Sequence, residues 1–213
     1  MSVRLLARMY LPNKRLFVHC IRRGSNGDQP EGVSRRYTAI VLIGLATELE
    51  SDTIRACGGD SPREICGRIL DDVGSVTNLG DVALTLWAAR LWRHSNAQAA
   101  LDRLRVLDPV RGAHDTVEIA WALTALSCSG EASGWPAGDA GLAKRVAGRL
   151  AALFHESSGA FQHVPSDASP SRTRAHVCCF ADLVYPTQAF SYYGRMTGDK
   201  TALDLAKRGA EFM

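Results

Sequence analysis

The sequence lacks a long apolar run. Its longest, from Ala39 to Ala46, is far short of the roughly 18 residues that a membrane span requires. The first residues include Arg4 and Arg8 within an apolar stretch, and no small-residue cleavage pattern follows them, so no secretory signal peptide is predicted. These absences predict a cytoplasmic protein without a membrane partner.

Neither sign of charge dominates, since 25 Lys and Arg face 22 Asp and Glu, for a net charge of +3. The charges are spread along the chain, so no nucleic-acid partner is predicted. Six cysteines show no Cys-x-x-Cys spacing and too low a density for a disulfide framework, which predicts reduced thiols. The adjacent Cys178 and Cys179 would point to different sides of a helix, so we expect no metal and no cofactor.

Apolar residues recur at helical spacing in two alternating kinds of segment. One kind is apolar nearly all round and predicts buried helices at 37–49, 82–93 and 116–127. The other kind is amphipathic and predicts half-exposed helices at 62–73, 96–107 and 139–155. A last pair is expected at 177–196 and 200–213. This alternation predicts an all-α single domain over 1–213, with an inner and an outer helix layer.

An internal repeat supports this layering. Asp81 and Asp115 are each followed six residues later by Trp-Ala, and the two copies are offset by 34 residues. A weaker third copy begins at Asp182. The repeat predicts equivalent positions for Trp87 and Trp121 on neighbouring inner helices.

Two short Phe-x-His segments, 15–19 and 159–163, have the alternation of a brief strand or hairpin arm. Each leads through a polar loop, 22–35 or 164–175, into an inner helix. Long ordered loops tend to carry function, so these loops predict the working end of the array.

Alternating inner and outer helices, with Asp at inner-helix starts and short extended segments ahead of them, resemble the α/α-toroid proteins. Two branches are similar: the six-hairpin glycosidases and sugar epimerases, and the terpenoid cyclases and protein prenyltransferases. The resemblance implies inner helices around a cavity, with a site at one end. The chain departs from the second branch because it has no Asp-x-Asp-Asp, and Asp71-Asp72 continues without the further acid that would hold magnesium.

A toroid of six hairpins has more helices than the periodicity of this chain predicts. We therefore expect a partial or truncated toroid, or a domain completed by self-association or by another chain. Uncovered apolar surface on the terminal inner helices would follow from that.

The candidate catalytic groups are carboxylates at inner-helix starts. Asp115 and Asp182, with Asp81, would surround one end of the cavity, although Asp is also among the best N-caps. Glu118 lies in an otherwise apolar helix one turn after Asp115, and a buried carboxylate there suits a general acid or a structural salt bridge to Arg.

Aromatic and basic residues complete the candidate site. The aromatic residues could stack on sugar rings or pack in the core: Tyr37, Trp87, Trp121 and Tyr185. The basic residues lie in or beside the two polar loops and predict a basic mouth for an anionic group: His19, Arg36, His163, Arg174 and His176. Because inner helices of a toroid run parallel, we expect His19 and His163 at the same end as Asp115 and Asp182.

Three functions fit these residues. The first is a carbohydrate-active enzyme, whether hydrolase, lyase or epimerase, that uses Asp115 or Glu118 with Asp182. The second is an isoprenoid-handling toroid with a mostly apolar aromatic cavity. The third is a non-catalytic helical scaffold that binds a protein partner.

Overall fold

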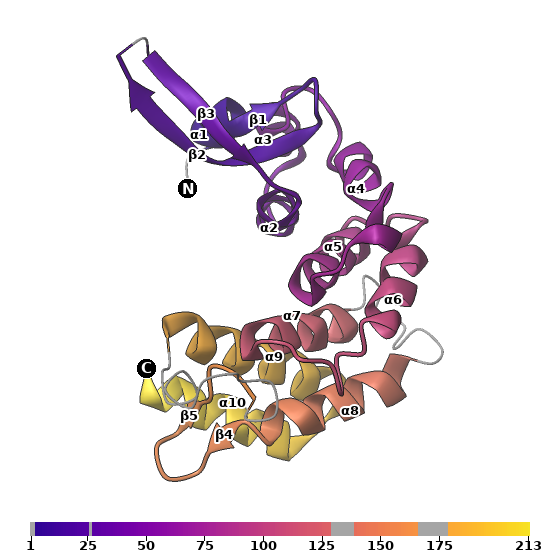
Figure 1. Cartoon of the computed structure of the whole chain (residues 1–213), viewed down its shortest axis with the longest axis vertical. Helices are drawn as coiled ribbons and strands as arrows, with labels where there is room; N and C mark the ends of the chain where they lie inside the picture. Colours follow the sequence, from indigo (N-terminus) through magenta and orange to yellow (C-terminus); the bar gives the residue numbers. More distant parts are fainter. Residues whose placement is uncertain (1–2, 26, 129–138, 166–178) are drawn as a thin grey trace.

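The computed structural model describes residues 3–25, 27–128, 139–165 and 179–213. Four inner helices pack side by side in chain order: α2 (Arg35–Leu45), α5 (Leu79–Leu91), α7 (Thr116–Ser127) and α9 (Phe180–Thr197). Four outer helices alternate with them: α4 (Pro62–Leu70), α6 (Ala97–Val106), α8 (Asp139–Ala151) and α10 (Lys200–Phe212). Figure 1 shows the two layers as a curved arc, which confirms the predicted alternation.

Burial explains why the two kinds of helix take these layers. In α5 and α7 nearly every residue is buried, because neighbours cover each of these helices on several sides. The outer helices bury one face, as their amphipathic sequences predict. The outer helix α4 begins with a capping box, in which Ser61 accepts from the Glu64 N–H and Glu64 accepts from the Ser61 N–H.

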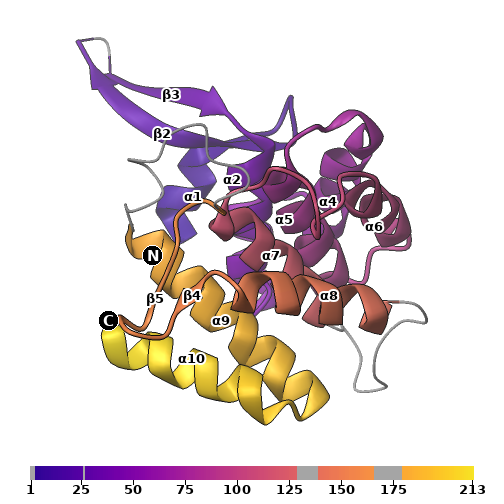
Figure 2. The same cartoon turned by 60° about the horizontal axis from the view of Figure 1, so that its bottom comes forward.

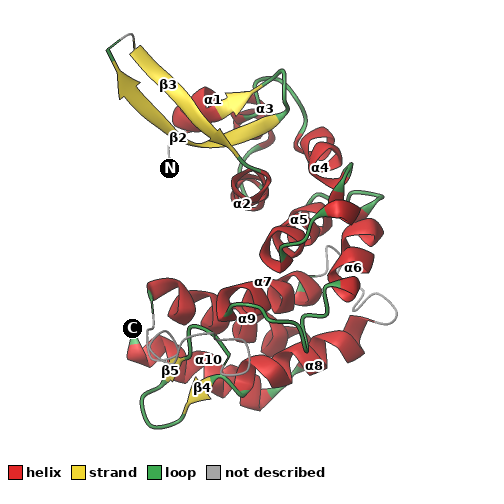
Figure 3. Cartoon of the chain, in the orientation of Figure 1, coloured by secondary structure: helices red, strands yellow, loops and turns green. Residues whose placement is uncertain are grey.

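Two small antiparallel sheets precede the first and last inner helices (Figure 3). The first sheet contains β1 (Tyr10–Leu11), β2 (Leu16–Gly24) and β3 (Gly27–Val33); the second contains β4 (Phe154–His155) and β5 (Ala160–Phe161). The two Phe-x-His segments therefore contain strands, as predicted, and Phe17 and Phe161 are buried. Figure 2 shows β4 and β5 beside α9 and α10.

The prediction of a polar loop at 22–35 is wrong. Most of this segment belongs to the β2–β3 hairpin, whose strands pair from Val18↔Val33 to Gly24↔Gly27. Backbone pairing between β2 and β3 overrode a composition typical of loops. Three short helices were not predicted: α1 (Val3–Met9), α3 (Glu50–Ala56) and the 3₁₀ turn η1 (Val73–Ser75). Most of the second loop lies outside the described residues.

Within the described ranges, no helix is both long enough and apolar enough to cross a bilayer. None of the five cysteines in these ranges forms a disulfide. Burial raises the pKa of the Cys57 and Cys66 thiols to about 12, so both stay protonated at neutral pH.

A buried ion pair and its neighbours join four helices, α5 to α8, away from the sheets. Arg90 of α5 donates to the carbonyl oxygens of Ala125 at 2.6 Å and Leu126 at 3.1 Å, at the end of α7. Its other terminal nitrogen binds Asp139, the first residue of α8, whose side chain is 0% exposed. Arg105 of α6 reaches the second oxygen of Asp139 at 3.3 Å.

We expect Arg90→Ala to lower the free energy of unfolding by about 3–5 kcal/mol, because it leaves the Asp139 carboxylate buried without its closest cation. The matched control is Arg105→Ala. That side chain is 40% exposed, and its loss should cost about 1 kcal/mol or less. Urea unfolding followed by circular dichroism measures the free energy of unfolding of both variants. Equal losses would show that the Arg90 contact stabilises the fold no more than the Arg105 contact does.

Candidate functional site

Three consecutive inner helices carry an acid as their third residue: Asp81 in α5, Glu118 in α7 and Asp182 in α9. A carboxylate there lies beside the unpaired N–H groups of the helix start. This register corrects the expectation that Asp81 and Asp182 are N-caps, since Asn78 and Cys179 hold those positions.

Asp115 does hold the N-cap position of α7, but its side chain makes no capping hydrogen bond and is exposed. Its carboxylate therefore faces solvent at the start of the helix. Glu118 follows one turn later and is mostly covered, with 14% of its side chain exposed.

One amide joins the first turns of α2, α5 and α7. Asn78 Oδ1 accepts from the Asp81 N–H at 2.9 Å and from Arg36 Nη2 at 2.9 Å. Its Nδ2 donates to Glu118 Oε1 at 2.5 Å. Arg36 Nε also donates to Asp81 Oδ1 at 2.6 Å. These contacts gather the inner-helix starts at one end, which we call the mouth.

Glu118 has an imidazole as its second neighbour. His114 Nδ1 lies 3.9 Å from Glu118 Oε2, and His114 Nε2 lies 2.8 Å from the carbonyl oxygen of Leu107. The acceptor at Leu107 makes Nε2 the donor nitrogen. The alternative of a salt bridge to Arg does not hold within the described residues, where an amide and a histidine take its place.

An aromatic pair lies between α7 and α9. The rings of Trp121 and Tyr185 meet edge to face, with centroids 5.1 Å apart. The Arg36 guanidinium lies over the Trp121 ring, 5.6 Å from its centroid. Trp121 Nε1 is buried and has no hydrogen-bond partner in the described part of the chain.

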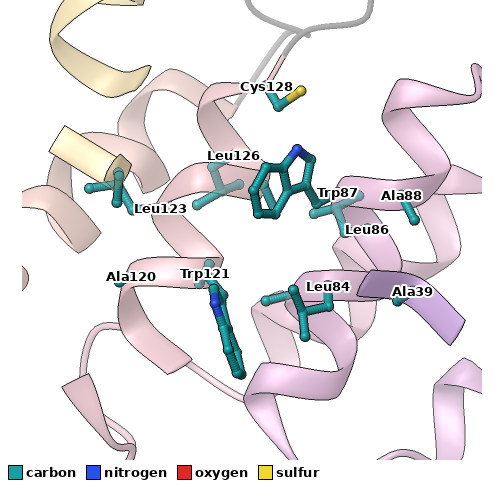
Figure 4. Packing of buried hydrophobic residues seen from close by; sticks show 14 of the residues in the cluster. Ala39, Leu84, Leu86, Trp87, Ala88, Ala120, Trp121, Leu123, Leu126 and Cys128 are labelled. Atoms are coloured by element: carbon teal, nitrogen blue, oxygen red, sulfur yellow. The ribbon is translucent and has the colours of Figure 1, made fainter. Parts of the chain in front are cut away.

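Trp87 and Trp121 are equally buried, at 5% and 7% exposure, as the repeat predicted, but their positions differ. Trp87 is the ninth residue of α5 and Trp121 the sixth of α7. Figure 4 shows the two indoles where α5 packs against α7; they point toward opposite ends of these helices, with Trp87 near Cys128. Trp87 packs against Tyr192 at 6.1 Å, so it lies away from the mouth.

The start of α9 holds a second polar group. Asp182 is 0% exposed, and its Oδ2 accepts from the Cys179 N–H at 2.8 Å and lies 2.9 Å from His163 Nδ1. The His163 carbonyl accepts from the Thr116 N–H at 3.1 Å, which places this group beside the start of α7. His163, Asp115 and Asp182 therefore share the mouth.

His19 and Tyr37 lie at the α2 side of the mouth. Their rings are 5.6 Å apart, and His19 Nδ1 is 3.1 Å from the carbonyl oxygen of Gly32 in β3. His19 is exposed and is joined to the other site residues through Tyr37 and its neighbour Arg36. The predicted residues Arg174 and His176 lie outside the described part of the chain.

The predicted basic mouth is largely neutralised where the structure describes it. Arg36 is paired with Asp81, and Arg35 donates to Asp72 and to the Ile69 carbonyl. The hydrogen bond from Arg35 lowers the pKa of the Asp72 carboxyl, so that group stays charged and keeps Arg35 paired.

No protein-family model matches this sequence, and no curated protein matches it. A structural match is a solved α-1,6-mannanase, GH76A of Salegentibacter sp. HEL1_6, in complex with α-1,6-mannotriose. The two chains are 15% identical, with a TM-score of 0.63 over 99% of this chain and 68% of the other. The chain has the α/α-toroid fold. Within that fold, the mannanase is of the six-hairpin glycosidase-like type.

The mannanase was studied as an inactive variant in which two neighbouring aspartates are replaced by asparagine. The one adjacent aspartate pair of this sequence is Asp71-Asp72. Both are exposed at the end of outer helix α4 and are paired with Arg68 and Arg35. They do not belong to the group of third-residue acids at the mouth.

Sequence reasoning missed Asn78, Gly80 and His114. The spacing Asn78-x-x-Asp81 is itself a helix-start signal and could have corrected the cap assignment. Gly80 was not singled out, although a Cβ there would lie 3.0 Å from two ring atoms of Trp121. His114 has no local signal, since its partner Leu107 precedes it across a turn.

We expect Gly80→Ala to lower the free energy of unfolding by about 1 kcal/mol, because the methyl group would displace the Trp121 ring, although alanine is the better helix former. Gly148→Ala in α8 is the matched control. Apart from the backbone of its own helix and its chain neighbours, no atom lies within 4 Å of the added Cβ, so this variant should raise the free energy of unfolding by about 0.5–1 kcal/mol. Chemical unfolding of both variants measures the difference, and stabilisation by both would mean that Trp121 is not tightly held.

Proposed function

We propose that this protein is a carbohydrate-active enzyme that binds its sugar at the mouth of the inner helices. The observation that carries the proposal is the set of third-residue acids beside the Trp121–Tyr185 pair. Carbohydrate sites combine aromatic faces with carboxylates that accept hydrogen bonds from hydroxyl groups. The fold shared with a mannanase that binds mannotriose supports the same assignment.

The mouth offers groups that a sugar would satisfy. Trp121 Nε1 and Thr116 Oγ1 are buried without hydrogen-bond partners among the described residues. Buried polar groups are costly when unpaired, and sugar hydroxyls both donate and accept. Tyr185 is only partly buried, so its ring is available to a ligand.

In this proposal Glu118 exchanges a proton with the substrate, and Asp115, exposed one turn earlier, supplies the second carboxylate. Hydrolysis, elimination and epimerisation of a sugar all require one group that donates a proton and one that removes it. Asp182 is buried against His163, so it would influence the substrate only through the His163 imidazole.

The isoprenoid alternative expects a dry aromatic cavity. The hydrogen-bond network among Arg36, Asn78, Asp81 and Glu118 favours a polar ligand instead. The cytoplasmic location rests on the sequence alone.

The test is isothermal titration calorimetry with a panel of oligosaccharides that begins with α-1,6-mannotriose. We expect one member of the panel to bind, and Tyr185→Ala to weaken that binding at least tenfold, or about 1.4 kcal/mol. Tyr192→Ala is the matched control, since this tyrosine lies on the same helix and packs against Trp87 away from the mouth. Equal effects of both variants, or no binding across the panel, would contradict the proposal.

Glu118→Gln separates binding from chemistry. If Glu118 exchanges the proton, this variant should bind the sugar within about threefold of the native chain but lose turnover by about a hundredfold or more. Mass spectrometry of the sugar products measures turnover. Full activity in the variant would remove Glu118 from the mechanism.

A scaffold or self-association role has a separate observation in its favour. The two outermost inner helices expose apolar residues: Tyr37 at 45% and Ile40 at 38% in α2, and Phe180 at 74% in α9. We propose that 1–213 forms one hairpin domain, a partial toroid, and that a second chain covers this surface. Light scattering should then give a mass above 23.0 kDa, whereas a stable monomer at high concentration would contradict it.

A further inference from the structure

A histidine, a cysteine and an aspartate meet at the start of α9. One donor atom from each of His163, Cys179 and Asp182 lies within 4.8 Å of the other two. In the part of the chain that the structure describes, this is the only group of three such residues close enough to hold one metal ion.

Three segments of the chain meet here: the end of the β4–β5 hairpin, the start of α7 and the start of α9. His163 follows β5 by two residues, and its carbonyl accepts from the Thr116 N–H of α7 at 3.1 Å. Cys179 caps α9, and Asp182 is turned back toward it by the hydrogen bond from the Cys179 N–H at 2.8 Å. The donors are therefore positioned before any ligand arrives.

Asp182 supplies an independent sign of a missing partner. Its side chain is 0% exposed, yet its Oδ1 has no hydrogen-bond partner among the described residues. A buried carboxylate with an unsatisfied oxygen is costly unless a cation or a donor reaches it. His163 contacts Oδ2 of Asp182, so this contact does not satisfy Oδ1.

We propose that His163, Cys179 and Asp182 bind one zinc ion. Imidazole nitrogen, thiolate and carboxylate are the three donor types that zinc takes, and sulfur excludes magnesium and calcium. Around a tetrahedral zinc ion the donors lie about 3.2–3.8 Å apart, so side-chain shifts of about 1 Å complete the site. Nothing in this proposal depends on the carbohydrate function.

The charges balance when the ion binds. The thiol of Cys179 gives its proton to solvent, and thiolate plus carboxylate neutralise the two positive charges of zinc. Cys179 is exposed and the His163 side chain is 30% exposed, so water reaches a fourth coordination position.

This inference departs from the sequence-based prediction that the chain binds no metal. That prediction considered the adjacent Cys178 and Cys179 and the absence of Cys-x-x-Cys. It could not pair Cys179 with a histidine 16 residues earlier, across a hairpin end and a loop.

The test uses the full chain freed of metal with a chelator and titrated with Zn²⁺ by calorimetry and with Co²⁺ by absorption. We expect one equivalent of either ion, and a near-ultraviolet thiolate-to-cobalt band. Cys179→Ser should lose that band, and His163→Gln should keep it but bind Zn²⁺ more than tenfold more weakly. Cys20→Ser and His155→Gln, the latter at an exposed histidine of β4, are the controls, and both should bind Zn²⁺ and Co²⁺ like the native chain.

Zinc that does not saturate near one equivalent would overturn the site, as would a thiolate band that persists in Cys179→Ser. Circular dichroism confirms that each variant folds. If Cys179→Ser does not fold, His163→Gln decides, because native affinity in that variant would also overturn the proposal.

Discussion

The mouth depends on the hydrogen bonds of one side chain, Asn78. Its oxygen caps α5 and accepts from Arg36 of α2, while its nitrogen donates to Glu118 of α7. An amide can do this because it carries a donor and an acceptor on one carbon, whereas a carboxylate could only accept. Three helices that pack mainly through small and aliphatic residues thus have their first turns held by a polar contact.

The apolar character of the inner helices explains why, among the described residues, the candidate site lies at their ends. In α5 and α7 the buried stretch leaves little room for polar groups, and Thr85 and Thr124 there donate to carbonyl oxygens of their own helices. The first turns differ, because their N–H groups need partners from outside the helix. Asp182 meets that need by accepting from the Cys179 N–H, whereas Asp81 and Glu118 accept from the side chains of Arg36 and Asn78.

The helix layers could be predicted because burial imposes a repeat of apolar residues that is visible in the local sequence of each helix. The helix starts were less predictable. Asp81 and Asp115 look alike in sequence, but Asp81 is the third residue of its helix and Asp115 is the N-cap of its own. The two positions differ by about one turn. Asn78 makes this difference, because its side chain caps α5 three residues before Asp81. The repeat of 34 residues aligned the two aspartates and so placed Trp87 level with Trp121, although their indoles point to opposite ends of α5 and α7 (Figure 4).

The candidate site was predictable only where a residue stands out in its local sequence. Glu118 was visible because a carboxylate in an apolar helix is unusual, and the Phe-x-His pattern brought His163 to attention. Its contact with Asp182 could not be derived, since it depends on how the β4–β5 hairpin lies against α7 and α9. Long-range packing of this kind has no signature in either segment alone.

A crystal structure grown with α-1,6-mannotriose or another bound oligosaccharide tests most directly whether the mouth is a sugar site. We predict a sugar ring against Tyr185, with hydroxyl groups within hydrogen-bond distance of Glu118 and of Trp121 Nε1. A sugar bound elsewhere on the surface, or a mouth filled by the side chains of a second protein chain, would contradict it.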